Sequence, residues 1–284
     1  MDKIKSFGII GGDKRQLYCA RSLAADGFGV ILCGFDRSED TPELPLWDLK
    51  GAISESDALI LPVPVSRDGK TVFSPLSSGI IELGRCLELC GREKPVFFGV
   101  YGKAEPSVLE GYRAYCYGSR NDFAAANAVP TAEGAIMTAV SESSRCLTLS
   151  PCLVTGYGRI GRVLAHMLRG MGADVTVSAR KSEDLELIRA AGMKAVHTGN
   201  ITGSYDFIFN TVPALVLDGD TLRRCASGLV IDLASPPGGV DDRAAEELSV
   251  RVIHALSLPG KTAPESAGDI IKKTVYNIIR EEDI

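Results

Sequence analysis

The sequence predicts an α/β protein with two doubly wound parallel sheets of the Rossmann type, placed around a cleft and joined by long connector helices. Three observations lead to this prediction. Short apolar segments alternate with helical patterns in both halves of the chain, an order that builds parallel sheets covered by helices. An Ala-rich segment separates the halves, and a glycine-rich turn follows the first apolar segment of the second half.

Length and composition agree with a two-domain globular protein. The 284 residues fit two domains of about 100–200 residues each. The net charge of −5 argues against a nucleic-acid partner, which requires a basic face. No apolar run approaches the roughly 20 residues that span a bilayer, and the start of the chain resembles a strand rather than a signal peptide. We therefore expect a cytoplasmic protein without a membrane partner.

Eight cysteines lie in apolar segments and form no C-x-x-C pair. Buried free thiols are the expected state. The alternative is a metal or redox pair formed by Cys86 and Cys90, which share a helix face. No other spacing of Cys, His or carboxylates indicates a metal site.

The first predicted domain covers residues 1–120 and is completed by the last helix, residues 264–284. Its strand candidates are short apolar runs, at 5–10, 29–33, 58–62, 95–99 and 113–118. One helix is expected to run to Ala25 after a Gly-Gly turn. A second is expected within 77–91, where apolar residues recur at helical spacing before a terminal glycine.

The predicted connector covers residues 121–143 and forms one long helix or a pair of helices. Pro130 should kink or restart it. The second predicted domain covers residues 144–263. Its strand candidates lie at 152–156, 174–178, 194–196, 206–210, 229–233 and 251–255. An amphipathic helix opened by Pro264 closes the chain.

The motif GYGRIG, residues 156–161, has the G-x-G-x-x-G spacing of dinucleotide-binding turns. It follows a predicted strand and opens a helix, which is the context that this pattern requires. Its glycines allow a tight turn, a close approach of the pyrophosphate and close helix packing, while the helix N-terminus favours phosphate. The alternative is a turn that binds nothing. The assigned cofactor contacts are Gly156, Gly158, Arg159, Ile160 and Gly161.

The end of the next strand indicates which dinucleotide binds. NAD-binding units place an acid there to hold the ribose 2′-hydroxyl. Here Asp174 precedes the strand, and Ser178, Arg180 and Lys181 follow its apolar core. A hydroxyl and two cations suit a 2′-phosphate, so NADP is favoured over NAD. The alternative is a solvated turn.

Two later turns, within residues 210–213 and 232–235, also follow predicted strands. They lie at the carboxyl edge, which binds ligands in such sheets. The alternative for each residue is ordinary turn chemistry. The candidate cofactor contacts are Asn210, Thr211, Val212, Pro213, Asp232, Ala234 and Ser235.

Three further segments place polar residues where the cleft is expected. They lie in the turn after the first strand, in the connector, and in a Pro-Gly turn before the last helix. The alternatives are a second nucleotide site at the first turn and capping of helix starts by Thr131 or Thr262. The candidate residues are Asp13, Arg15, Gln16, Asn127, Thr131, Glu133 and Lys261.

Taken together, the motifs resemble those of the dipicolinate synthase A-subunit. The stretches that carry the resemblance are GIIGGDKRQ, NAVPTAEGAI, GYGRIG, NTVP, DLASPPGG and LPGKTAPESAG. They run from about residue 4 to the last helix. The family has a formate/glycerate dehydrogenase-like architecture, with two α/β domains joined by long helices.

The resemblance implies NADP-dependent dehydrogenation of dihydrodipicolinate, a small dicarboxylate, to dipicolinate during sporulation, in the cytoplasm of the mother cell. It implies a flavoprotein-like partner, the dipicolinate synthase B-subunit. Arg15 and Lys261 would hold the substrate carboxylates and Asp13 or Glu133 would accept the proton, while Gln16, Asn127 and Thr131 would donate hydrogen bonds. Related 2-hydroxy-acid dehydrogenases carry a histidine where this chain reads PGKT, residues 259–262, so a His–carboxylate relay is not expected.

Two other functions remain open from the sequence. One is a different NADP-linked oxidoreductase of a small carboxylic acid. The other is a non-catalytic NADP-binding subunit that supports a flavoprotein-like partner. Analogy with two-domain dehydrogenases also predicts a homo-oligomer.

Overall fold

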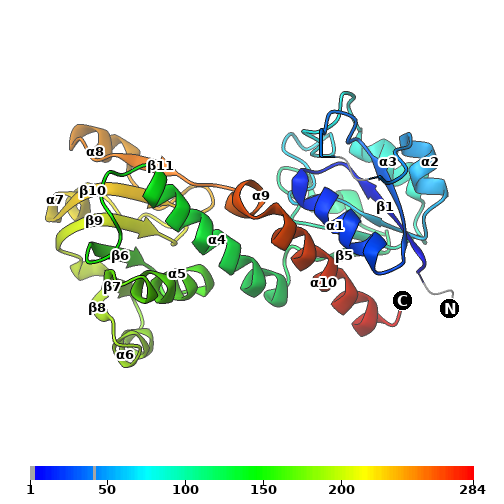
Figure 1. Cartoon of the computed structure of the whole chain (residues 1–284). Coiled ribbons are helices and arrows are strands. Elements are labelled where there is room, and N and C mark those ends of the chain that lie inside the picture. Colours follow the sequence, from blue (N-terminus) through cyan, green and yellow to red (C-terminus); the bar gives the residue numbers. More distant parts are fainter. Residues whose placement is uncertain (1–3, 41–42) are drawn as a thin grey trace. The chain divides into compact units, whose positions relative to one another are not determined.

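The computed structural model describes residues 4–40 and 43–284, with Ala226 and Ser227 described by their backbone alone. The chain divides into two compact units (Figure 1). Unit 1 comprises Met1–Asn127 and Ala263–Ile284, and unit 2 comprises Ala128–Thr262. Residues 1–3 of the first predicted domain lie outside the described range. Each unit has a parallel sheet with helices on both faces, which confirms the predicted fold class.

Unit 1 contains a parallel sheet of five strands in the order β2-β1-β3-β4-β5. All five fall on predicted strand segments. Phe7 of β1 pairs with Val30 of β2 on one side and with Ala58 of β3 on the other. The strands are β1 Ser6–Ile10, β2 Gly29–Cys33, β3 Ala58–Ile60, β4 Val96–Phe98 and β5 Ala114–Cys116.

Helices cover both faces of this sheet because successive side chains of a strand point to opposite faces. Phe7 and Ile9 pack in the same core cluster as residues of α1 and α10, and Ile10 packs with residues of α2 and α3. These helices are α1 Lys14–Ala25, α2 Leu49–Ser54, α3 Leu83–Cys90 and α10 Pro264–Glu282, and a short 3₁₀ turn, η1, covers Pro106–Leu109.

The C-terminal helix α10 packs closely against α1. A Cβ at Gly268 would lie 2.6 Å from the backbone nitrogen of Cys19, so this glycine allows the two helices to approach. At the far end of α1, Asp26 accepts hydrogen bonds from Lys272 and Tyr276, both at 2.8 Å. The last helix is therefore part of the core of unit 1.

Unit 2 contains a parallel sheet of six strands in the order β11-β10-β9-β6-β7-β8. All six fall on predicted strand segments, although β9 and β10 begin three and four residues earlier than expected. The strands are β6 Pro151–Thr155, β7 Asp174–Ala179, β8 Lys194–His197, β9 Gly203–Asn210, β10 Cys225–Asp232 and β11 Val252–His254.

The core of unit 2 also has two layers. Leu164 and Leu168 of α5 pack on one face with Ala132 and Ala135 of α4. Residues of α7 and α8 share the other core cluster with Leu153 of β6. The helices are α4 Asn121–Ser141, which begins in unit 1, α5 Arg159–Gly170, α6 Ser182–Ala190, α7 Gly219–Arg224, α8 Asp242–Glu247 and α9 Leu258–Thr262, and a 3₁₀ turn, η2, covers Thr198–Asn200.

Of the two forms expected for the connector, one long helix or a pair of helices, the structure has the first, because α4 continues through Pro130. The helix expected within 77–91 is present as α3, which begins at Leu83 and has Gly91 as its C-cap. One local prediction was wrong. The segment around Lys261 is a short helix, α9, rather than a Pro-Gly turn. Thr262 does not cap a helix start, because it donates back to the Leu258 carbonyl at 2.9 Å.

The cysteines are free thiols, as expected, and six of the eight are buried. Burial raises the pKa of the Cys86 thiol to about 12, which keeps it protonated and unreactive near neutral pH. Cys146 departs from the prediction because it is exposed.

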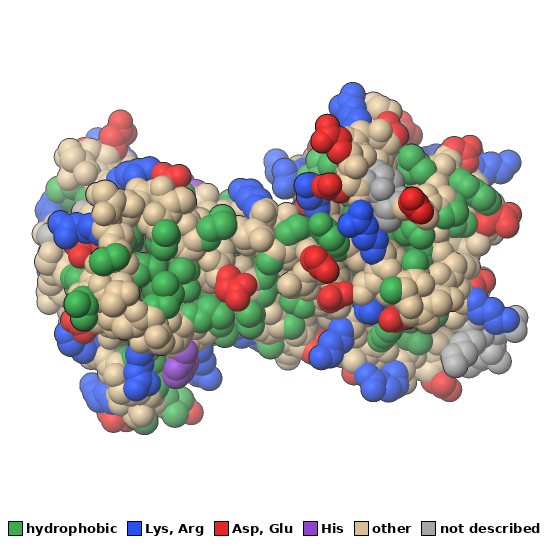
Figure 2. Space-filling view, viewed as in Figure 1, with side chains coloured by type: hydrophobic (Ala, Val, Ile, Leu, Met, Phe, Trp, Pro, Cys, Tyr) green, Lys and Arg blue, Asp and Glu red, His purple; other side chains and the backbone are tan. Residues whose placement is uncertain are grey.

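The surface in view mixes acidic and basic side chains, and apolar side chains gather around α4 (Figure 2). Val129, Met137 and Val140 of α4 are each between 42% and 55% exposed. Among the described residues, no helix is long and apolar enough to cross a membrane.

Candidate functional site

The centre of the unit 2 sheet has the geometry of a ligand-binding edge. The strand order changes direction between β6 and β9, because β7 and β8 lie on one side of this pair and β10 and β11 on the other. Ligands of open parallel sheets bind outside the carboxyl ends of the strands at such a switch point. The turns after β6 and β9, residues 156–158 and 210–213, meet there: a Cβ at Gly156 would lie 2.7 Å from Val212.

The three motif glycines have different physical roles. Gly156 has a φ of +89° and so occupies the left-handed region that favours glycine. A Cβ at Gly161 would lie 2.2 Å from the Gly156 carbonyl oxygen, so only glycine lets α5 begin this close to the turn. Gly158 is the N-cap of α5, is exposed, and would place a Cβ in open space. That space lies over the N-terminus of α5. Because the N-cap is a glycine, no N-cap side chain accepts a hydrogen bond from the backbone N–H groups of the first turn.

A buried polar network fixes the loops of this edge. Asn210 is fully buried and donates to Asp232 at 2.7 Å and to the Val212 carbonyl at 3.0 Å. Its side-chain oxygen accepts from the Thr155 hydroxyl at 2.5 Å. Asp232, also fully buried, accepts in addition from the backbone N–H of Ala234 at 3.1 Å. These side chains bond to one another and to the loop backbone, so they hold the loops in place.

The groups that remain accessible at this edge belong to the loops themselves. Pro213 and Ser235 are exposed, and Thr211 and Val212 are partly exposed. Arg159 is exposed at the start of α5. A ligand would therefore meet these residues, with Asn210, Asp232 and Ala234 acting behind them.

The end of β7 presents two cations to solvent. Arg180 and Lys181 are exposed, and Lys181 is the N-cap of α6. Ser178 lies in the strand with its hydroxyl fully buried and without a hydrogen-bond partner among the described residues. The structure therefore leaves Arg180 and Lys181, and not Ser178, accessible to a phosphate.

Sequence reasoning missed two acids next to these cations. Glu183 and Asp184 lie in the first turn of α6. Asp184 is held by Arg162 of α5 at 3.0 Å, which directs its charge toward α5. The open space at Gly158 and the helix N-terminus behind it fit the pyrophosphate of a dinucleotide cofactor.

Unit 1 has its own switch point between β1 and β3, since its strand order is of the 2-1-3-4-5 type. The turn after β1 carries Asp13, Arg15 and Gln16. Asp13 is the N-cap of α1 and forms a capping box with Gln16. Arg15 is buried, pairs with Asp13 through two hydrogen bonds of 2.9 and 2.8 Å, and donates to the Val63 carbonyl at 2.6 Å. The structure thus brings the three residues together, and most of their polar atoms serve one another.

One hydrogen-bond donor of these three residues, on the Gln16 side chain, has no partner among the described residues. This side-chain nitrogen is buried. Tyr117 lies nearby and donates its hydroxyl to the Leu61 carbonyl at 2.8 Å. Burial raises the pKa of Tyr117, so it remains a neutral hydroxyl.

The remaining predicted residues lie on α4 and α9. Asn127 and Thr131 are one helical turn apart and are partly buried and buried respectively, whereas Glu133 is exposed on another face of α4. Lys261 is exposed on α9. Gly134 lets α9 pack on α4, because a Cβ there would lie 2.9 Å from Leu258.

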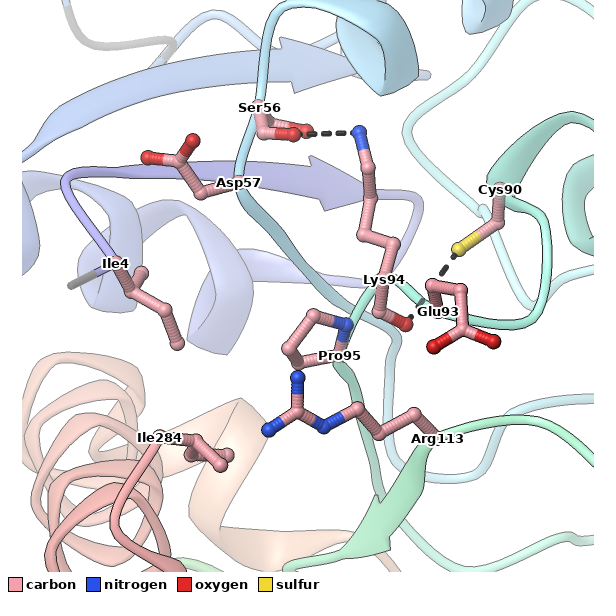
Figure 3. Close-up of a pocket in the computed structure, with 9 residues that line it drawn as sticks. All are labelled: Ile4, Ser56, Asp57, Cys90, Glu93, Lys94, Pro95, Arg113 and Ile284. Atoms are coloured by element: carbon pink, nitrogen blue, oxygen red, sulfur yellow. Dashed lines mark hydrogen bonds between the residues drawn. The ribbon is translucent and has the colours of Figure 1, made fainter. Parts of the chain in front are cut away.

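A cavity of about 540 Å³ lies at the opposite, amino edge of the unit 1 sheet (Figure 3). Its polar groups serve the fold. Lys94 donates to the carbonyls of Ile53 and Ser56 at the end of α2, and Asp57 accepts from the backbone of Lys5 at 2.8 Å. Ligands of parallel sheets bind at the other edge, so this cavity does not form part of the candidate site.

Comparisons with known proteins were consistent with this geometry. A family model described as the N-terminal domain of the dipicolinate synthase A-subunit matches residues 6–117. The dipicolinate synthase A-subunit of Bacillus subtilis (strain 168) is 28% identical over 295 residues, covering 96% of this chain and 95% of the relative. The crystal structure of the dipicolinate synthase A-subunit from Bacillus halodurans is 30% identical, covers 97% of both chains and has a TM-score of 0.87.

The chain belongs to the dipicolinate synthase A-subunit family. The family name implies a partner subunit. The fold is more widely shared: the transhydrogenase of Sinorhizobium meliloti has a TM-score of 0.66 at 16% identity, with 95% of this chain and 92% of that chain covered. At that identity the likeness concerns the fold alone.

Proposed function

We propose that this chain is an NADP-dependent dehydrogenase that oxidises dihydrodipicolinate to dipicolinate in the mother cell of a sporulating bacterium. Membership of the dipicolinate synthase A-subunit family supports the substrate. The observation that carries the cofactor assignment is the open space at Gly158, over the start of α5, together with the two exposed cations after β7.

The cofactor would be held mainly by the backbone. The N–H groups at the start of α5 favour the pyrophosphate, and the turns 210–213 and 232–235 border the rest of the dinucleotide. Arg180 and Lys181 would bind the 2′-phosphate, for which a guanidinium fork and an ammonium group are well suited. When bound, NADP supplies the acceptor for a hydride.

The chemistry demands little acid–base assistance. The substrate loses a hydride from one ring carbon and a proton from its neighbour, and the aromatic ring formed makes the oxidation favourable. The protein must therefore orient the substrate, which alone contributes several kcal/mol in favourable cases. Asp13, fixed by Arg15, and Glu133, exposed on α4, are the proposed proton acceptors.

The proposed carboxylate ligands differ in availability. Lys261 is exposed and has no ion-pair partner among the described residues. Arg15 already pairs with Asp13, so it would contact a substrate only through its remaining N–H groups. Gln16, Asn127 and Thr131 complete the proposed set of neutral donors, and the buried amide nitrogen of Gln16 has no partner among the described residues.

A second function is favoured by one observation. Asp13, Arg15 and Gln16 form a capping box and ion pair whose groups largely satisfy one another, as residues with a purely structural role would. The chain would then bind NADP without turnover and support a flavoprotein-like B-subunit.

The reaction is tested by following absorbance at 340 nm with purified chain, NADP and freshly generated dihydrodipicolinate, in parallel with the ultraviolet band of dipicolinate. The proposal predicts that both signals grow together with NADP and far more slowly with NAD. Adding the B-subunit tests the second function. Dipicolinate formed only when the B-subunit is present, without reduction of NADP, would contradict catalysis by this chain.

A further inference from the structure

A second cavity, of about 450 Å³, lies in unit 1 among segments that carry none of the predicted site residues. It is lined by Arg37, which follows β2, and by side chains of the 67–81 segment between β3 and α3. Both segments leave the carboxyl edge of the sheet, where parallel α/β domains bind ligands. The volume falls in the range typical of small-molecule sites.

The walls of this cavity are well anchored. The Phe73 carbonyl accepts from the backbone N–H of Gly12 at 2.7 Å, which joins the 67–81 segment to the turn after β1. The backbone N–H of Arg37 donates to the Leu76 carbonyl at 2.9 Å. Asp36 accepts from the backbone N–H of Ser78 at 3.0 Å. The two lining segments therefore hold each other at a fixed separation.

The two arginines of this cavity form no ion pair within the described part of the chain. Neither the Arg37 nor the Arg67 guanidinium forms a side-chain hydrogen bond or salt bridge with any described residue. Arg67 lies over the Phe73 ring, 4.1 Å from the ring centroid, and this contact fixes its orientation. Two guanidinium groups beside one cavity attract an anion.

Asp68, which lines the cavity, forms no ion pair with either arginine. Asp68 accepts hydrogen bonds from the Ser66 hydroxyl and from the backbone N–H groups of Lys70 and Thr71, at 2.8–2.9 Å. Its other oxygen accepts from the Thr71 hydroxyl at 2.7 Å. These donors hold the pKa of Asp68 well below its usual range, so the carboxylate is stabilised without help from an arginine.

The remaining lining chemistry favours a flat ring over a bare ion. The lining includes the apolar side chains of Phe73 and Ile81 beside the polar residues Thr71, Ser74 and Ser77. A guanidinium fork matches the two oxygens of a carboxylate, and an aromatic ring stacks on a planar partner.

We propose that this cavity binds a small, flat ring that carries carboxylates, with Arg37 and Arg67 as the carboxylate ligands and with Phe73, whose ring carries Arg67, as an apolar contact. Identifying this ring with the substrate rests on the proposed function. The assignment adds two arginines to the substrate-recognition residues, whereas the Arg15 guanidinium is largely occupied by Asp13.

The test is a calorimetric titration of dipicolinate into the full chain without cofactor, in metal-free buffer. Arg37→Ala and Arg67→Ala should each weaken binding about tenfold or more, which corresponds to the loss of one charge-assisted contact. Arg85→Ala is the matched control, because Arg85 is an exposed arginine of the same unit that pairs with Glu88 on α3. NADP affinity, measured in the same variants, should stay unchanged and reports that they are folded.

Three results would overturn the assignment: no binding of dipicolinate to the unmodified chain, binding by both arginine variants as tight as that of the unmodified chain, or inorganic phosphate binding as tightly as dipicolinate. Each leaves the proposed function open to its own test, since reduction of NADP is measured separately. Conversely, binding of dipicolinate through Arg37 and Arg67 without reduction of NADP would support this binding site and contradict the proposed activity.

Discussion

Gly158→Ala tests the cofactor assignment with little risk to the fold. The backbone of Gly158 is extended, with a φ of −79°, and a Cβ there meets no atom within 4 Å. Alanine is a poorer N-cap than glycine, which costs about 0.5–1 kcal/mol of stability. The new methyl group would occupy the space assigned to the pyrophosphate. Losing two charge-assisted hydrogen bonds of at least ~1.5 kcal/mol each gives about 3 kcal/mol, or roughly 150-fold in Kd.

Calorimetry with NADP measures this effect, and Gly170→Ala is the control. Gly170 ends the same helix, is exposed, and also has open space at its Cβ position. That variant should bind NADP normally and gain up to ~1 kcal/mol of stability. If Gly158→Ala, folded by circular dichroism, bound NADP within twofold of the unmodified chain, the pyrophosphate would not lie over this turn.

Three further predictions concern charge and buried polar groups. Arg180→Ala should weaken NADP far more than NAD in equilibrium titrations, whereas Arg189→Ala, exposed on the helix that follows, should change neither; equal loss of both cofactors would refute the 2′-phosphate contact. Asp232→Ala should destabilise unit 2 by about 3 kcal/mol or more in urea unfolding, because it removes the acceptor of three hydrogen bonds, from Asn210, Ala234 and Gly239; an unchanged midpoint would contradict the network. The Arg120 guanidinium lowers the pKa of Asp122 to about 2. The stabilisation by this pair is therefore present above the ordinary carboxyl pKa and is lost as pH falls from about 4 to 2. Asp122→Asn should flatten the acid-induced loss of stability over that interval.

The strands could be predicted from sequence because most are buried on both faces and so appear as continuous apolar runs. The run GVILC matches β2 residue for residue. The helices α2, α7 and α8 contain six residues each, which is less than two turns and too short for a helical period to stand out. The continuation of α4 through Pro130 depends on tertiary packing of its alanines, which overrides the local preference.

The cofactor edge was predictable because its signal is local: the glycine spacing lies within six residues. The role of each polar side chain at this edge could not be predicted from the sequence. Ser178 lies near the end of β7 and Asp232 ends β10, and both are fully buried, whereas Arg180 directly after β7 is exposed. The cavity at Arg37 and Arg67 was missed because thirty residues separate the two arginines.

Direct hydride transfer is the central claim, and isotope transfer measures it most directly. The purified chain is incubated with NADP and dihydrodipicolinate deuterated at its saturated ring carbons, and the cofactor is analysed by mass spectrometry. We predict reduced cofactor that is one mass unit heavier, in equal amount to the dipicolinate formed, and far less of both from Gly158→Ala when NADP is below saturation. Dipicolinate that accumulates while NADP stays oxidised or unlabelled would contradict the account.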